Sequence, residues 1–212
     1  LFAYNGDQMA EELNMQSKHS IEKQTAHHVD CFTTVSDITA RECLELLDKP
    51  VDVVLPNGFE DDFVPRGAAF TRKRKWARKR LLDVANALLG TDLGDETLLN
   101  VVAFVKVPGW VGEPRKDLQD RLASGKKFDT PLEVPSVTHW LHDMSHDNVL
   151  SMLKHLDMQN RKEDRVKLIF IPCYLTGNDG ILNLSYYDVI LGNDLCIYPS
   201  YYEPWGYTPL ES

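Results

Sequence analysis

The chain has 212 residues, of which 43% are hydrophobic and 26% are charged, and its formal net charge is −9. This composition is typical of a soluble globular protein with one large or two small domains, and it excludes an intrinsically disordered chain. The longest apolar runs, 101–105 and 166–175, are shorter than the ~18 residues that span a bilayer, and we find no signal-peptide pattern. The acidic balance argues against general nucleic-acid binding.

The four cysteines are scattered along the chain and lack the CxxC spacing of a metal or redox site. They are Cys31, Cys43, Cys173 and Cys196. Three of them, all but Cys43, lie in apolar, strand-like contexts, where a reduced and buried thiol is the usual state. We therefore expect a cytoplasmic protein.

The first half of the chain alternates between helical and extended patterns. The alternation predicts a parallel sheet with helical crossovers. The expected elements are a helix over 20–30 with Ser20 as its N-cap, a strand over 31–36, a helix over 37–47, a buried strand over 51–58, and a long helix over 71–89 that ends at Gly90.

The second half continues the α/β series. The expected elements are a strand over 100–109, a helix over 117–124, a helix over 145–156, a strand over 165–172, a short helix over 184–193 and a strand over 194–200. One junction does not fit, because 94–105 runs the apparent start of one strand directly into another. Parallel neighbours need a connection of about a dozen residues, so we expect a segment to be missing near Leu99–Asn100.

Two charged clusters have alternative interpretations. The run RKRKWARKR at 72–80 holds seven of the 23 cationic residues. It could bind a polyanion, but such a run is more often a solvated helix face, with Trp76 packed against the protein. The spacing of His139, His142 and His146 with Asp143 suggests zinc, but without a firm geometry we favour a structural or surface role.

The segment SYYEPWGYTPLES at 200–212 has the composition of a ligand-binding loop. Thr208, Pro209 and Glu211 have the pattern of a helix start with a capping box. The loop would then lie between the carboxyl end of a strand and a helix amino terminus, where phosphate groups bind in open α/β sheets. The residues alone leave open the simpler interpretation, in which Glu211 only caps a helix and Trp205 only packs.

The same segment is similar to the signature loop of the animal and fungal type of glycogen synthase, a family of retaining glucosyltransferases with the two-domain GT-B architecture. Glu203 and Glu211 match that superfamily's Glu-x7-Glu motif. Further similar stretches occur in the family's order at 30–47, 52–59, 101–108, 137–150 and 164–175. The resemblance covers most of the chain and indicates a bacterial relative, present as an incomplete chain.

This resemblance implies an α/β fold with the Rossmann-like parallel sheets of a GT-B glycosyltransferase. The expected divisions are a remnant of the N-terminal domain over 1–58, a linker and basic helix over 59–93, and an incomplete nucleotide-sugar-binding domain over 94–212. The family's glycine-rich loop and active-site histidine would precede Leu1. Its GRYE…NKG segment, which supplies an Arg and a Lys for the leaving diphosphate, would lie at the junction near Leu99–Asn100.

The resemblance also implies roles for individual residues. Glu203 corresponds to the catalytic glutamate beside the transferred glucose. The substrate-binding residues would be Trp205 and Gly206 at the sugar, Tyr207 and Thr208 at the diphosphate, Glu211 at the ribose, Tyr186 stacked on uracil, Tyr174 in the base pocket and Asn57 facing the cleft.

The implied reaction moves glucose from a nucleotide sugar, with UDP-glucose favoured over ADP-glucose, to the 4-hydroxyl of an α-1,4-glucan with retention. No metal or other cofactor is expected, so backbone N–H groups and cations would neutralise the diphosphate. We expect no nucleic-acid or membrane partner, and we allow for a homo-oligomer. Because segments are missing, the 212-residue polypeptide alone is expected to be inactive. The alternative is a non-catalytic module that binds a nucleotide sugar or a polyanion.

Overall fold

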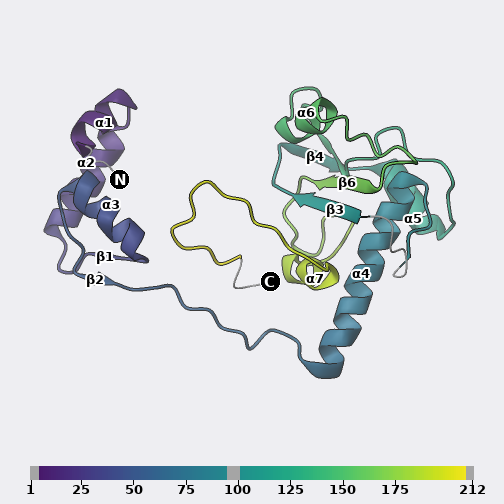
Figure 1. Cartoon of the computed structure of the whole chain (residues 1–212), viewed down its shortest axis with the longest axis horizontal. Helices are drawn as coiled ribbons and strands as arrows, with labels where there is room; N and C mark the ends of the chain where they lie inside the picture. The colour runs from purple at the N-terminus through teal and green to yellow at the C-terminus, as the bar shows by residue number, and fades with distance from the viewer. Residues whose placement is uncertain (1–4, 95–100, 209–212) are drawn as a thin grey trace. The chain divides into compact units, whose positions relative to one another are not determined.

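The computed structural model describes residues 5–94 and 101–208, which form two compact units (Figure 1). Unit 1 comprises the described residues of Leu1–Phe63 and Ile197–Ser212, and unit 2 comprises those of Val64–Cys196. The three-part domain division that the sequence suggests stays a prediction. Among the described residues, no helix combines the length and the apolarity needed to cross a membrane.

Unit 1 begins with two helices, α1 (Gly6–Glu12) and α2 (Gln16–His28). The sequence did not predict α1, whose N-cap, Asn5, accepts a hydrogen bond from the Gln8 backbone N–H at 3.0 Å. Helix α2 starts four residues before the expected position, so the prediction of Ser20 as its N-cap is wrong. The Ser20 hydroxyl instead donates to the Ser17 carbonyl inside the helix, as serine hydroxyls in helix interiors often do.

A small β-α-β unit follows, formed by β1 (Thr33–Thr34), α3 (Asp37–Leu47) and β2 (Val53–Val54). The two strands are parallel, as predicted, with Thr33 opposite Val53. Helix α3 has its predicted bounds, because the Ser36 and Thr39 side chains form a reciprocal capping box at its start.

The strand predicted over 51–58 was expected to be buried, and that prediction is wrong. Only two residues pair, and Val53 and Leu55 are 46% and 56% exposed. The buried apolar side chains described in unit 1 are those of Ala10 and Ala26. The apolar residues of 51–58 predicted a buried strand, but the described part of unit 1 contains no second layer that covers them.

Unit 2 holds the larger core. Its elements are α4 (Gly67–Leu89), β3 (Val101–Lys106), β4 (Val111–Pro114), α5 (Lys116–Ser124), β5 (His139–Leu141), α6 (Asn148–His155), β6 (Val166–Ile171) and α7 (Tyr186–Gly192). Strands β3 and β6 are parallel and in register from Val101–Val166 to Lys106–Ile171. The α/β fold class with parallel sheets is thus confirmed.

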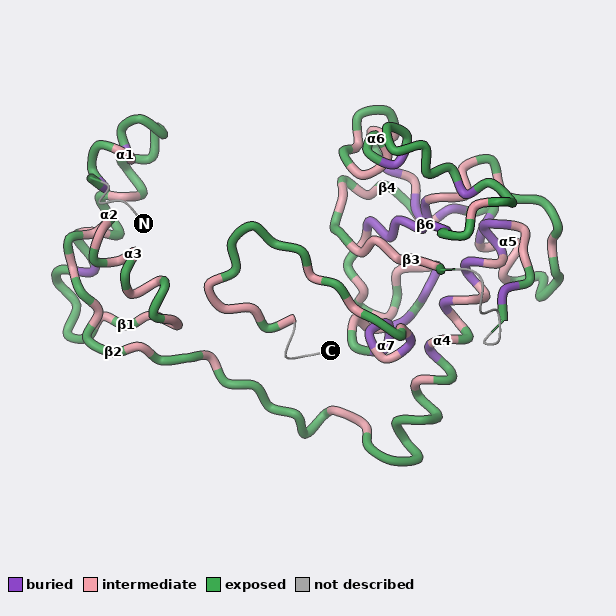
Figure 2. The backbone as a smooth tube through the Cα atoms, in the orientation of Figure 1, coloured by how far each residue is buried: buried purple, intermediate pink, exposed green. Residues whose placement is uncertain are grey.

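The core of unit 2 lies between β6 and helices α4, α5 and α7 (Figure 2). Leu81, Ala85 and Leu88 recur on one face of α4 and are almost completely buried, as the helical period predicts. Gly90 ends α4 in the left-handed conformation at φ 62°. A Cβ atom there would lie 2.2 Å from the Thr130 backbone. Both the positive φ and this close contact therefore require glycine at position 90.

Two further features of the chain differ from the sequence prediction. Strands β4 and β5 form an antiparallel pair that we did not predict, because Gly112 and Pro114 interrupt a run of only four residues. The strand predicted over 194–200 is not formed. Leu195 and Ile197 are 76% and 75% exposed, and the described part of the chain offers this stretch no strand to pair with.

Candidate functional site

The described residues of the terminal segment belong to unit 1. Glu203 and Tyr207 are exposed, while Trp205, Gly206 and Thr208 are half-buried. Pro209 and Glu211 lie outside the described residues, so the expected helix start and the role of Glu211 stay predictions.

Two contacts fix the shape of this segment. The Ser200 hydroxyl donates to the Tyr202 carbonyl at 2.8 Å. The Tyr202 hydroxyl donates to a carboxylate oxygen of Glu42, on α3, at 2.5 Å. This hydrogen bond raises the pKa of Tyr202 to about 12. The indole N–H of Trp205 is buried and has no hydrogen-bond partner among the described residues, which leaves a donor available to the segment.

Asn57, the other candidate in unit 1, follows β2 in an irregular stretch and is half-buried. At the neighbouring Gly58, a Cβ atom would have no heavy atom within 4 Å. The backbone is therefore open at Gly58, and the expectation that Asn57 faces a cleft stays a prediction.

Tyr174 and Tyr186 belong to unit 2. Tyr174 follows β6 and is 75% exposed, whereas Tyr186 begins α7 and is half-buried. The Tyr186 N–H donates to the Leu175 carbonyl at 3.0 Å, and Thr176 forms a bridge with Ser185. These backbone contacts bring the segments that carry the two tyrosines side by side.

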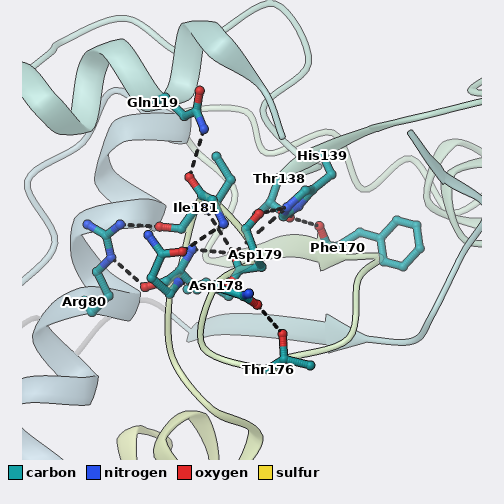
Figure 3. Close-up of polar contacts among 12 residues, drawn as sticks. Arg80, Gln119, Thr138, His139, Phe170, Thr176, Asn178, Asp179 and Ile181 are labelled. Atoms are coloured by element: carbon teal, nitrogen blue, oxygen red, sulfur yellow. Dashed lines mark hydrogen bonds and ion pairs between the residues drawn. The ribbon is translucent and has the colours of Figure 1, made fainter. Parts of the chain in front are cut away.

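The loop between these segments, 177–184, is organised by one buried carboxylate (Figure 3). The Asp179 side chain, 1% exposed, accepts backbone N–H groups from Ile181 at 3.0 Å, Leu182 at 2.7 Å and Asn183 at 2.8 Å. Gly180 adopts φ 85°, a conformation that glycine allows at little cost. The loop is thus a rigid support for the start of α7.

Helix α4 holds this loop from outside. The Arg80 guanidinium donates to the carbonyl oxygens of Ile181 and, at 2.9 Å, Leu182 (Figure 3). From α5, the Gln119 amide donates to the Gly180 carbonyl at 3.1 Å. Sequence reasoning missed both Asp179 and Arg80, although the Gly-Asn-Asp-Gly run at 177–180 is a recognisable turn signal.

The basic run continues this contact along α7. Arg74 donates to the carbonyls of Leu191 at 3.0 Å and Asn193 at 2.7 Å, at the carboxyl end of α7. Arg74 and Arg78 both pair with Asp194, at 2.7 and 2.6 Å. Much of the run therefore binds its own chain, and the prediction of a solvated face is wrong for these side chains.

The first turn of α7 is held by Lys73, whose ammonium lies 2.8 Å from an Asp188 oxygen. Burial raises the pKa of Asp188, but hydrogen bonds from Lys73 and Ser185 outweigh it and leave the pKa below its ordinary value. Trp76, predicted to pack, is 52% exposed, because the neighbouring cations, and not the indole, face α7.

The histidines of the 139–146 cluster do not converge. The ring of His142 lies 5.0 Å from that of Trp110, and the exposed His146 pairs with Asp143 at 2.8 Å. His139 alone points inward, to Asp179 (Figure 3). His142 and His146 are exposed side chains, whereas His139 is buried; the sequence-based preference for structural and surface roles stays a prediction.

The cysteines are free, as expected, but the prediction that three are buried is wrong. Cys31 is exposed, and Cys173 and Cys196 are of intermediate exposure. None of the three lies within a strand, since the predicted strands are shorter or absent there. Burial, with a smaller contribution from the charge of Asp179, raises the pKa of the Cys173 thiol to about 11.

Comparison with known proteins agrees with the family resemblance that the sequence motifs indicate. The family model described as glycogen synthase matches residues 1–66 and 117–212. The chain is 27% identical to glycogen [starch] synthase isoform 1 of Saccharomyces cerevisiae over 302 aligned positions, which cover 98% of the chain and 43% of the yeast protein. It is 27% identical to glycogen [starch] synthase of Neurospora crassa and 26% identical to the human liver protein of that name, covering 42% of each.

The chain therefore spans about two fifths of the length of these relatives. The alignment with the yeast protein runs over 302 positions, more than the 212 residues of the chain. The relative thus has residues inside the aligned span with no counterpart here. The stretch without a family match, 67–116, contains the junction at Leu99–Asn100, which itself lies outside the described residues.

Proposed function

The chain belongs to the glycogen synthase family, and we propose that the intact protein transfers glucose from UDP-glucose to the 4-hydroxyl of an α-1,4-glucan with retention of the α configuration. The observation that carries this proposal is the match of the family model to residues 117–212, which include Glu203, Tyr174 and Tyr186. The presence of Glu203 in an exposed and tethered segment supports it.

In the proposed reaction, Glu203 lies beside the transferred glucose. The bond between the anomeric carbon and the diphosphate oxygen breaks, and the acceptor hydroxyl oxygen forms the new bond to that carbon while its proton passes to the departing diphosphate oxygen. A carboxylate at this position would stabilise the positive charge that develops on the sugar in the transition state. Trp205 and Gly206 would bind the sugar, and Tyr207 and Thr208 the diphosphate.

The base and the ribose of the donor would bind separately. Tyr186 would stack on the uracil ring beside Tyr174, and the rigid 177–184 loop supports this role because it fixes the start of α7. Glu211 would accept hydrogen bonds from the ribose hydroxyls, and Asn57 would face the cleft. We propose that backbone N–H groups and cations, without a metal, neutralise the leaving diphosphate.

The partners and the location of the protein follow from this chemistry. We propose a cytoplasmic enzyme whose partners are a nucleotide sugar and glycogen, with no nucleic acid or membrane partner, and with a homo-oligomer allowed. Because Arg74, Arg78 and Arg80 are engaged by α7 and its flanking loops, the polyanion-binding alternative loses three of the seven cations of the 72–80 run.

The experiment is transfer of labelled glucose to glycogen by the intact protein, with UDP-glucose and ADP-glucose compared as donors. We expect incorporation that α-1,4-specific hydrolases release again. Nucleotide-sugar binding in calorimetry without any transfer would overturn the proposed activity and favour the non-catalytic module. Preferential use of ADP-glucose would overturn the donor assignment alone.

A further inference from the structure

Lys106 is the last residue of β3 and pairs in register with Ile171, the last residue of β6. Because the two strands are parallel, their carboxyl ends meet at one edge of the sheet (Figure 1). We propose that Lys106 binds the diphosphate group of the nucleotide-sugar donor at this edge. This role, which rests on the proposed function, is one that the family resemblance does not assign to Lys106.

The side chain of Lys106 extends from the face of the sheet that α7 covers. Along β3, Phe104 packs against the large core cluster that includes Val189 of α7, whereas Val105 packs against the second cluster. Successive side chains of a strand alternate between the two faces, which places Lys106 on the same face as Phe104. Its pairing partner Ile171 is completely buried in the same core cluster.

The tyrosines proposed to bind the base follow the same edge of the sheet. Tyr174 comes shortly after the end of β6 and is 75% exposed. Tyr186 begins α7, and its backbone N–H donates to the Leu175 carbonyl at 3.0 Å, which joins the start of α7 to the segment that leaves β6. In open α/β sheets, ligands bind outside the carboxyl ends of the strands. Lys106 is therefore a cation at the edge where a nucleotide bound by these tyrosines would lie.

Lys106 has no acidic partner among the residues that the structure describes. Within that part of the chain its ammonium makes no ion pair, and the titratable neighbour that acts on it is the Cys196 thiol. Lys73 on α4 differs in this respect, because its ammonium lies 2.8 Å from an Asp188 oxygen. The ammonium of Lys106 is thus available to an anion from outside the protein.

Burial makes this unpaired charge costly. Lys106 is half-buried, and its burial lowers the pKa of the ammonium below the ordinary lysine value of 10.5, while Cys196 opposes the shift only in part. A cation that has lost part of its water needs a compensating anion. A diphosphate supplies charged oxygens that accept strong hydrogen bonds from an ammonium, so donor binding would offset a cost that is present in the free protein.

A simpler alternative is that Lys106 only covers the core. Its alkyl chain would pack along the sheet while the ammonium reaches water, as long basic side chains often do. In that case methionine, which has a similar unbranched and apolar chain, would replace Lys106 without any effect on phosphate binding. The two interpretations therefore give opposite results for Lys106→Met.

The test compares the binding of UDP and of uridine to the intact protein by calorimetry, since only UDP carries the diphosphate. Lys106→Met should weaken UDP binding by about tenfold or more, as loss of a hydrogen bond to a charged group does, and should leave uridine binding unchanged. Lys106→Arg keeps the charge and should recover part of the lost UDP affinity. The control is Lys162→Met, which changes an exposed lysine that precedes β6, at the opposite edge of the sheet. It should bind UDP as the unchanged protein does.

Stability separates a ligand-binding role of Lys106 from a structural one. Because the unpaired ammonium is half-buried, its removal in Lys106→Met should leave the free energy of unfolding unchanged or raise it. Chemical denaturation without nucleotide measures this change. A residue needed for packing would give the reverse result, a loss of stability that also weakens uridine binding.

An amine-acylating reagent applied to the unchanged protein gives an independent measurement that requires no variant to fold. Burial lowers the pKa of Lys106 and so leaves more of its amine unprotonated, which is the form that reacts. Peptide mass spectrometry should show that saturating UDP slows the acylation of Lys106, whereas uridine does not. The acylation of Lys162 should be the same with either compound.

The role of Lys106 alone would be overturned by an unchanged UDP affinity in folded Lys106→Met, or by equal losses of UDP and uridine affinity. Acylation of Lys106 at the same rate with and without saturating UDP would overturn it as well. If the unchanged protein did not bind UDP, the proposed UDP-glucose donor would be overturned, and the role of Lys106 with it. UDP binding by the unchanged protein therefore distinguishes a failure of the proposed function from a failure of this role.

Discussion

The Tyr202 hydroxyl donates a hydrogen bond of 2.5 Å to Glu42, so the residue next to Glu203 is tethered to helix α3. The tether spans 160 positions of sequence. It gives an exposed segment a fixed attachment at the position where the proposed function needs a carboxylate held in place.

We predict that Glu42→Gln lowers the pKa of Tyr202 from about 12 towards its ordinary value of 10.0, because the hydrogen bond to the carboxylate is the largest cause of the shift. The tyrosine pKa is raised, so the tether is complete below pH 10 and is lost as the pH rises through the folded-state value. Difference absorbance of tyrosinate, with Tyr202→Phe to assign the signal, measures this. An unchanged titration in Glu42→Gln would contradict the tether.

The close contact of α4 with α7 predicts a steric effect at Gly192. A Cβ atom there would lie 2.8 Å from Leu81 Cδ1 and 3.1 Å from the backbone of Ala77. Gly192→Ala should lower the free energy of unfolding by about 1–3 kcal/mol, as overpacking does. Chemical denaturation measures the change. Gly94→Ala, where a Cβ atom meets nothing within 4 Å, is the control, and equal effects would contradict the packing.

The pairing of Asp194 with Arg74 and Arg78 predicts a smaller effect. Asp194→Asn should reduce the free energy of unfolding by about 1 kcal/mol or less, because the carboxylate is 66% exposed and solvent screens it. The control is Asp83→Asn, which breaks only the exposed pair with Lys79 and should cost less. A larger loss of unfolding free energy in Asp83→Asn than in Asp194→Asn would contradict a stabilising role for the Asp194 ion pairs.

The same pair has a predicted pH dependence. A hydrogen bond from Arg78 is the largest cause that holds the pKa of Asp194 below its ordinary value of 3.8. The contribution to stability is therefore present above about pH 3.8 and is lost as the pH falls through the folded-state pKa. Denaturation midpoints of the protein and of Asp194→Asn should converge below that pH. A constant difference would show that another group is responsible.

The sequence predicted the helices and the parallel pairing well where local signals suffice. The Ser36 capping box set the start of α3, and Gly90 set the end of α4. Strands depended on neighbours that the pattern cannot reveal. Leu195 and Ile197 have the apolar alternation of a strand, yet their side chains are exposed and their backbone forms no strand. A strand is stabilised only when a neighbouring strand or a packed layer covers it, and the local sequence does not reveal such a neighbour.

The resemblance predicted the candidate site residues, but it did not predict the contacts that hold the 177–184 loop. Motif similarity suggested Glu203, Tyr174 and Tyr186. Arg80, in contrast, contacts Leu182, 102 positions away in sequence, and no local pattern encodes that contact. The basic run shows the same limit. Its charge is obvious in the sequence, but its partners on α7 appear only in the fold.

The most direct test of the proposed activity is glucose transfer by the intact protein with Glu203→Gln, beside Glu163→Gln as an exposed control in unit 2. We expect the Glu203 variant to lose at least a hundredfold in kcat, as removal of one electrostatic group in a transition state does, with unchanged circular dichroism. The control should retain full activity. Undiminished transfer by a folded Glu203→Gln protein would contradict the assignment of Glu203 as the catalytic residue.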